Sequence, residues 1–240
     1  MKKNKQENGC RELTLRQTAK YLQKHDNYII LTHASPDGDT LGSAFALYYA
    51  LKEIGKAACV ICPDVIPEKY NYFARQTDHV SRDDATVVAV DVADKRLLGG
   101  LEEEFGDIVD LNIDHHISNV RFAKNLFLDA DAAATAESMY ELLGIMKVNI
   151  NDVTAKALYT GIATDTGCFK YSNVTAKTHM IVAQLYEYNI DAPEINRIMF
   201  DTKSRKLLEL ERMVLDASEF HFGGKCIILP VTAEMQEKTG

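Results

Sequence analysis

The sequence has no apolar run that approaches a membrane-spanning helix, which takes about 20 residues, and no internal repeat or low-complexity tract. It also lacks an excess of basic residues: 27 lysines and arginines stand against 35 aspartates and glutamates, for a formal net charge of −8. That balance argues against a broad nucleic-acid-binding surface. A short nucleotide held by metal ions is still compatible with it, because bound cations dominate the charge around them.

The N-terminus lacks the features of a secretion signal. Residues 1–9 are polar and carry lysines, and no apolar signal-peptide core follows them. We therefore expect a cytoplasmic protein that does not associate with a membrane. The five cysteines agree with this compartment, because an odd number without regular spacing does not make a disulfide framework.

Cys59 and Cys62 form a C-x-x-C pair, which can mark a zinc or redox site. A zinc site would need a turn between them and a second ligand pair, and the sequence shows neither. The pair lies in an expected strand, where residues three apart face opposite sides. We therefore interpret them as buried structural cysteines.

Apolar residues make up 46% of the chain, which is enough for a sizeable core. Short apolar runs alternate with segments of helical period, and this alternation predicts an α/β fold with a mainly parallel sheet flanked by helices. Thr135 and either Asn151 or Asp152 are expected helix N-caps. The expected strands are 28–32, 57–62, 86–90 and 108–113, and the expected helices are 13–24, 41–54, 135–144, 153–164, 175–188, 193–200 and 203–217.

The C-terminal part has a different pattern. Residues 203–217 read as an amphipathic helix, and residues 220–229 read as a hairpin about Gly223 and Gly224. Because a single hairpin is only marginally stable, we expect it to begin a second domain whose remainder lies outside this sequence. The expected division is an α/β domain over 1–195, a connecting helix over 196–218 and the start of a substrate-binding domain over 219–240.

Four acid-rich segments carry the chemistry, and the first is His33-Ala34-Ser35-Pro36-Asp37-Gly38-Asp39. It follows an expected strand and precedes a helix that starts near Thr40, the place where open α/β sheets bind ligands. Asp37 and Asp39 are close enough in sequence to bind two adjacent ions, one each. The helix N-terminus favours phosphate oxygens. The alternative is an ordinary Pro-Asp-Gly turn in which Asp39 caps the helix.

The second segment ends an apolar strand with Asp91, a position from which a carboxylate can bridge two metals. The alternative is a helix cap at the strand end, and nearby Asp94 reads as a solvated or capping residue. The third segment is Asp114-His115-His116. One imidazole can bind a metal while the other meets a phosphate, and Asp114 can orient a histidine.

The fourth segment places Asp165 at the end of a helix that Gly167 breaks. An acid there opposes the helix dipole and needs a cation, although an exposed loop acid is an alternative. Together with Asp37, Asp39 and Asp91, it would concentrate four negative charges that two divalent ions could neutralise. Carboxylate and imidazole ligands suit Mn²⁺, and two ions about 3.5–4 Å apart can activate water and clamp a phosphate. The segments therefore predict a metal-dependent phosphoester hydrolase.

These segments, in this order, resemble the DHH phosphoesterases. The resemblance is strongest to the RecJ-like branch that contains bacterial nanoRNases and 3′-phosphoadenosine-5′-phosphate phosphatases. It rests on the motifs His33-x-x-x-Asp37-x-Asp39, Asp91, Asp114-His115-His116-Ile117-Ser118-Asn119, Thr135-Ala136-Glu137 and Asp165-Thr166-Gly167-Cys168-Phe169. It covers about residues 14–235, and it implies a parallel α/β domain, a connecting helix and a smaller second domain.

The resemblance also implies roles for single residues. Asp91 would bridge two ions, usually Mn²⁺, and water activated by both metals would hydrolyse the phosphoester. His116 would contact the scissile phosphate, Asp114 would support the catalytic site, and Asn119 would contribute to substrate binding. The implied metal ligands are His33, Asp37, Asp39, Asp91, His115 and Asp165, with His33 and Asp37 favouring one ion and Asp39, His115 and Asp165 the other.

Three functions stay open. The first is hydrolysis of short oligoribonucleotides, linear dinucleotides or 3′-phosphoadenosine-5′-phosphate. The second is an inorganic pyrophosphatase or polyphosphatase of the same superfamily, and the third is a non-catalytic nucleotide-binding module. The expected partners are a short RNA or nucleotide substrate, with a homodimer as one option for the oligomeric state. Substrate preference, cleavage polarity and the ion used in the cell do not follow from the sequence.

Overall fold

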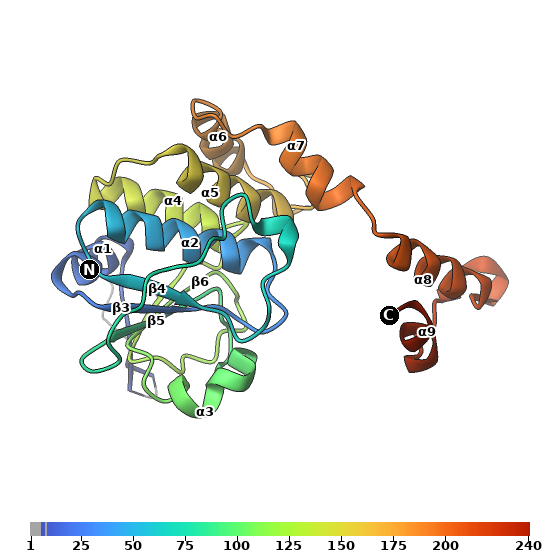
Figure 1. Ribbon diagram of the computed structural model, residues 1–240, viewed down its shortest axis with the longest axis horizontal. Coiled ribbons are helices and arrows are strands. Elements are labelled where there is room, and N and C mark those ends of the chain that lie inside the picture. The colour runs from blue at the N-terminus through green and yellow to red at the C-terminus, as the bar shows by residue number, and fades with distance from the viewer. Residues whose placement is uncertain (1–5, 8) are drawn as a thin grey trace. The chain divides into compact units, whose positions relative to one another are not determined.

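The computed structural model describes residues 6–7 and 9–240 of the chain (Figure 1). The N-terminal segment 1–9, from which we expect a cytoplasmic protein, therefore lies largely outside the described residues. The chain forms two compact units, Met1–Asn196 and Arg197–Gly240. In the described part of the chain, no helix combines the length and apolar character needed to cross a membrane.

A seven-stranded sheet of described residues organises the first unit. All neighbouring strands are parallel except β1, which pairs antiparallel with β2. This confirms the predicted α/β fold with a mainly parallel sheet. In spatial order the strands are β1 (Gln6–Glu7), β2 (Cys10–Glu12), β7 (Asn125–Leu128), β6 (Leu111–Asp114), β5 (Thr86–Val90), β3 (Tyr28–Leu31) and β4 (Ala58–Ile61).

Strands β3 and β5 are almost entirely apolar because both faces of the sheet are covered. Every residue of β3, β5 and β6 is buried. Figure 1 shows helices α1 (Leu15–Lys24), α2 (Gly38–Glu53), α4 (Thr135–Met146) and α5 (Asp152–Asp165) on one side of the sheet and α3 (Glu102–Phe105) on the other. On the α3 side, Leu98 and Phe105 pack against buried residues of β3 and β5.

Most expected elements are present with shifted ends. Helix α2 begins at Gly38 and not at residue 41, and the strand expected at 108–113 is β6, Leu111–Asp114. Strand β7 was not expected, because its four residues lack a long β-branched run. Among the cysteines, Cys59 is buried as predicted, whereas Cys62 is only half-buried. The first unit closes with α6 (Ala176–Leu185) and α7 (Ala192–Asn196), both shorter than expected.

Two glycines let α2 and α5 pack closely. A Cβ added to Gly42 would lie 2.4 Å from the backbone oxygen of Ala157, a separation that real Cβ atoms do not adopt. A Cβ on Gly161 would lie 2.7 Å from the Cβ of Ala136 and 2.9 Å from Oδ1 of Asp39. Glycine is required at both positions because it lacks a Cβ. This contact brings the start of α2 near the C-terminal part of α5.

The second unit begins with a π-helical turn, Arg197–Asp201, which leads to the amphipathic helix α8 (Arg205–Asp216). Strands β8 (Glu219–His221) and β9 (Cys226–Ile228) form the predicted antiparallel hairpin, and helix α9 (Ala233–Thr239) follows. The assignment of this unit to the start of a substrate-binding domain stays a prediction.

Candidate metal centre

Three of the four acid-rich segments follow neighbouring parallel strands. Strands β3, β5 and β6 lie side by side, so their carboxyl ends share one edge of the sheet. His33 lies just beyond β3, Asp91 directly follows β5, and Asp114 ends β6. The chain places β4 on one side of β3 and then β5 on the other. The crevice between β3 and β5 is therefore a topological switch point, where open α/β sheets bind ligands.

Asp37 positions the first segment by starting helix α2. Its Oδ1 accepts hydrogen bonds from the backbone N–H of Asp39, at 3.0 Å, and of Thr40, at 3.1 Å. Asp37 is therefore the N-cap, and the alternative in which Asp39 caps this helix is wrong. Asp39 lies in the first turn of α2, completely buried, so its carboxylate needs partners inside the protein.

Those partners come from the start of helix α4. The backbone N–H of Thr135 donates to Oδ2 of Asp39 at 2.6 Å, and the N–H of Ala136 donates to Oδ1 at 2.9 Å. The hydroxyl of Ser43 adds a third bond, 3.1 Å long. The prediction that Thr135 is the N-cap is wrong: Ala134 holds that position and offers no side-chain oxygen. An acid from α2 therefore takes the place of the missing cap.

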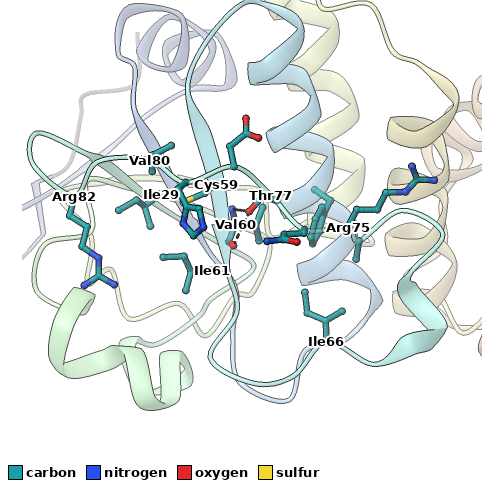
Figure 2. Close-up of a pocket in the computed structure, with 14 residues that line it drawn as sticks. Ile29, Cys59, Val60, Ile61, Ile66, Arg75, Thr77, Val80 and Arg82 are labelled. Atoms are coloured by element: carbon teal, nitrogen blue, oxygen red, sulfur yellow. Dashed lines mark hydrogen bonds between the residues drawn. The ribbon is translucent and has the colours of Figure 1, made fainter.

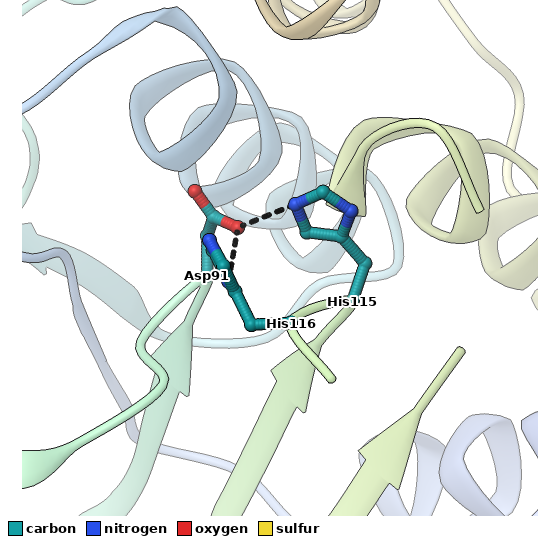
Figure 3. A group of neighbouring side chains, drawn as sticks. All are labelled: Asp91, His115 and His116. Atoms are coloured by element: carbon teal, nitrogen blue, oxygen red, sulfur yellow. Dashed lines mark ion pairs between the residues drawn. The ribbon is translucent and has the colours of Figure 1, made fainter. Parts of the chain in front are cut away.

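The carboxylate of Asp91 lies between His33 and His115. Its Oδ2 lies 3.8 Å from Nε2 of His33, and its Oδ1 lies 3.7 Å from Nε2 of His115. Figure 3 shows His115 and His116 converging on this same Oδ1, with Nδ1 of His116 at 3.6 Å. The two oxygens of one carboxylate thus face two separate sets of side chains.

The fourth segment completes the second of these sets. Asp165 is the last residue of α5, as predicted, and its Oδ2 lies 3.2 Å from Nε2 of His115. The same nitrogen lies 3.8 Å from Oδ2 of Asp39. All six predicted ligands converge in this way. Within the described residues, three groups place one ligand atom per member within 4.8 Å of the others: His33, Asp37 and Asp91; Asp39, His115 and Asp165; and Asp91, His115 and His116.

Backbone carbonyls orient the two inner histidines. Nδ1 of His33 lies 2.8 Å from the oxygen of Ala34, and Nδ1 of His115 lies 3.2 Å from the oxygen of Ala132. A carbonyl only accepts, so each Nδ1 carries the proton of the bond. When the ring is neutral, Nε2 then has a free lone pair directed at the carboxylates, as in metal-binding histidines.

Asp114 orients the third histidine, His116, through a hydrogen bond. It is completely buried, and its Oδ1 lies 2.7 Å from Nδ1 of His116. Asn119 donates its amide to Oδ2 of Asp114 at 2.6 Å, and its own Oδ1 accepts the backbone N–H of Arg121. Nε2 of His116, a side chain 42% exposed, is left for an external group.

The buried acids repel one another. Burial raises the pKa of Asp91 to about 7, and the charge of Asp37 adds to this rise. Burial likewise raises the pKa of Asp39 well above its ordinary value, with further contributions from Asp91 and Asp165. Each shift reports a negative charge that lacks sufficient compensation. A bound cation would supply it.

The same excess of negative charge raises the pKa values of two histidines. Burial lowers the pKa of His33, but its hydrogen bonds with Asp37 and Ala34 and the charges of Asp37 and Asp91 together raise the pKa to about 9. Burial also lowers the pKa of His115, while Asp165, Asp39 and Asp91 together raise it to about 10. Without metal, protons on these rings therefore take the place of a cation.

The backbone is strained at the centre of the cluster. Asp91 has a φ of +61°, in the left-handed region that favours glycine, and Ser35 in the first segment has a φ of +51°. Cys168, after Asp165, has a φ of +56°. Such conformations gather at functional sites, where the surrounding structure enforces them.

A separate pocket of about 500 Å³ lies beside β4 (Figure 2). Ile29, Cys59 and Ile61 face it from the sheet, and Arg75 and Arg82 come from the long loop before β5. No candidate ligand lines this pocket, so it does not belong to the acid-rich cluster.

Sequence reasoning missed the Thr135 hydroxyl, which donates to Oδ1 of Asp91 at 2.8 Å. In the sequence, Thr135 looks like an ordinary helix N-cap. The local sequence does not distinguish a threonine that caps its helix from one that binds an acid at the end of a strand. Ser43 was missed as well, because the sequence around a helical serine does not show that its hydroxyl bonds to a buried acid, here Asp39.

The sequence profile described as DHH family, N-terminal domain, matches residues 27–162. The chain is 35% identical over 218 residues to the bifunctional oligoribonuclease and PAP phosphatase NrnA of Thermus thermophilus, covering 88% of this chain and 64% of that protein. It is 27% identical over 188 residues to the protein of the same name from Bacillus subtilis, covering 76% of this chain and 59% of that protein. The chain thus spans less than two thirds of the length of these two relatives.

Among solved structures, an exopolyphosphatase-related protein from Bacteroides fragilis superposes with a TM-score of 0.80 at 23% identity. The match covers 94% of this chain and 71% of that one. At this identity the likeness shows a shared fold.

Proposed function

The chain belongs to the DHH family, and we propose that it hydrolyses phosphoester bonds in short oligoribonucleotides or nucleotides with two divalent metal ions. The observation that carries this proposal is the position of Asp91. One buried carboxylate directs one oxygen toward His33 and the other toward His115, at 3.8 and 3.7 Å. A carboxylate shared in this way is suited to bridge two ions.

We assign His33 and Asp37 to one ion, Asp39, His115 and Asp165 to the other, and Asp91 to both. The donor set of carboxylate oxygens and imidazole nitrogens suits Mn²⁺, which is the ion we propose. The buried, mutually repelling acids fit a dication pair, because only added positive charge lets them all ionise. When bound, two such ions supply Lewis acidity and a water that ionises near neutral pH.

The chain's own groups position the substrate. Asp114 fixes the ring of His116 through Nδ1, so that Nε2 can donate to an oxygen of the scissile phosphate once the ring is protonated. Asn119 has its amide and its carbonyl occupied within the chain, so its proposed contribution to substrate binding acts through Asp114 and the shape of this loop. The start of α4 keeps Asp39 in place through two backbone N–H groups.

The names of the two NrnA relatives favour a nucleotide substrate over pyrophosphate. The test is incubation of the chain with Mn²⁺ and 5′-phosphorylated diadenylate, 3′-phosphoadenosine-5′-phosphate or pyrophosphate, with chromatographic analysis of products. Asp91→Asn removes the proposed bridge. Asp107→Asn is the matched control, since Asp107 is an exposed acid paired with Lys95 and lies outside the ligand groups.

Release of AMP from either nucleotide by the parent chain and by Asp107→Asn, but not by Asp91→Asn, would support the proposal. Release of phosphate from pyrophosphate alone would replace it with a pyrophosphatase. Nucleotide binding without turnover of any substrate would replace it with a binding module.

A further inference from the structure

A second pocket adjoins the candidate metal centre on its β5 and β6 side. It has a volume of about 390 Å³, within the range of roughly 300–1,000 Å³ that small-molecule sites occupy. One wall is the loop after β5, and the other is the loop after β6. The lining residues are Ala93, Asp94, Arg96, Leu97, Ser118 and Val120.

Both walls are continuous with the metal centre. Ala93 is two residues beyond Asp91, and Ser118 is two residues beyond His116. Two residues of chain span at most about 7 Å, so both walls begin within that distance of Asp91 and His116. The backbone N–H of Val120 donates to the oxygen of Ala93 at 2.9 Å, which joins the two walls.

The first acid-rich segment is tied to the same pocket. The backbone N–H of Ala34, next to His33, donates to the oxygen of Leu97 at 2.7 Å. The pocket and the metal centre are therefore parts of one hydrogen-bonded set of loops at the carboxyl edge of the sheet.

The surface of this pocket is apolar and exposed. Leu97 is 46% exposed and Val120 is 51% exposed, although both line a concave surface. Ile117, between His116 and Ser118, is 88% exposed. Grouped exposed apolar side chains beside polar ones mark a binding site, whereas single ones do not.

Arg96 adds a planar cation that is paired with Asp94. Its Nε and Nη2 both donate to Oδ2 of Asp94, at 3.0 and 2.5 Å, while 79% of the side chain stays exposed. Asp94 neutralises the guanidinium, so the pocket offers a planar surface rather than an attractive field for phosphate. Guanidinium planes stack on nucleobases.

We propose that this pocket is a nucleobase subsite. It holds the base of a nucleotide whose phosphate lies at His116, with the ring between the Arg96 plane and the side chains of Leu97 and Val120. The hydroxyl of Ser118 faces the edge of the base. This inference rests on the proposed function, because it places a nucleotide at the metal centre.

The test is a titration of the ¹⁵N-labelled chain, with Mg²⁺ as a diamagnetic ion, followed by two-dimensional amide NMR. AMP is the probe, and ribose 5-phosphate is the control that lacks a base. We expect AMP, and not ribose 5-phosphate, to shift the amide signals of Leu97, Ser118 and Val120.

Substitutions separate stacking from charge. We expect Arg96→Ala to weaken AMP binding about 10-fold, as loss of one stacking surface does, and to leave the affinity for ribose 5-phosphate unchanged. Arg96→Lys should weaken it similarly, because it keeps the charge but loses the plane. Arg82→Ala is the matched control, since Arg82 is another exposed arginine paired with an acid, Glu104.

Equal shifts by AMP and ribose 5-phosphate, or an AMP affinity that Arg96→Ala and Arg96→Lys leave unchanged, would overturn the subsite. Hydrolysis plays no part in this measurement. If the Ser118 signal responds to AMP as expected while no substrate is hydrolysed, the proposed function fails and the subsite stands. If nucleotides are hydrolysed while AMP perturbs only the His115 and His116 signals, the subsite fails alone.

Discussion

The hydroxyl of Thr135 donates a 2.8 Å hydrogen bond to Oδ1 of Asp91, and both side chains are buried. The backbone N–H of the same threonine binds Asp39. The first residue of α4 therefore contacts two acids from different elements, Asp91 directly after β5 and Asp39 in the first turn of α2. The positive end of the helix dipole lies beside them, which favours their ionised forms.

We expect Thr135→Val to weaken Mn²⁺ binding by about 10-fold, because orienting hydrogen bonds to ligand carboxylates typically contribute 10–100-fold to metal affinity. Valine keeps the volume of threonine, so packing is preserved. Thr135→Ser retains the hydroxyl and should retain the affinity. Isothermal titration calorimetry measures both, and equal affinities for the valine and serine variants would contradict a role for the hydroxyl.

The two proposed ions can be removed one at a time. Asp37→Asn should lower the bound Mn²⁺ from two ions to one per chain, and Asp165→Asn should do the same at the other position. The double variant should bind none tightly, because each position loses a charged ligand. Metal content measured by electron paramagnetic resonance checks the stoichiometry. Loss of both ions in either single variant would argue against separate positions.

The metal-free chain should lose stability as pH rises from about 6.5 to about 10. His33 and His115 have folded pKa values of about 9 and about 10, above the ordinary 6.5, so the folded state holds protons that the unfolded state releases. Their contribution is complete below about pH 6.5 and is lost as pH rises toward these values.

We expect the melting temperature in EDTA to fall by about 3–5 °C per pH unit for each histidine within this window. With Mn²⁺ bound, neutral imidazoles serve as ligands, and the fall should disappear. Differential scanning calorimetry across the window makes the comparison. A metal-free chain whose melting temperature stays level would show that these histidines are not proton carriers.

Gly42→Ala should destabilise the first unit by about 1–3 kcal/mol or more, because the new Cβ would overlap the backbone of α5 at Ala157. Gly144→Ala is the matched control, since Gly144 also lies in a helix but its Cβ would meet nothing within 4 Å. That variant should be neutral or gain up to about 1 kcal/mol. Thermal unfolding compares them, and similar melting temperatures would contradict the close packing of α2 and α5.

Acids at strand ends were predictable because the rule that places them is local. Asp91 follows an apolar strand and Asp114 ends a buried one, and parallel strands align their carboxyl ends at one edge. Strand order was not predictable, because the sequence does not state that β5 and β4 lie on opposite sides of β3.

Contacts between distant segments were beyond local reasoning. The Thr135 hydroxyl satisfies the usual pattern of an N-cap, yet it binds an acid 44 residues away in the chain. Strand β7 has only four residues and was missed because its pairing with β6 decides its conformation. The cytoplasmic location and the homodimer stay predictions.

At Asp91, the left-handed backbone and the buried charge lower the stability of the fold, although the proposed chemistry needs this aspartate. A φ of +61° is easier for glycine than for aspartate, and replacement by glycine or by asparagine would remove a buried charge. Laboratory selection for heat resistance alone, without a demand for turnover, should therefore replace this residue early. The position best suited to the proposed chemistry is thus among the first that a stability screen would inactivate.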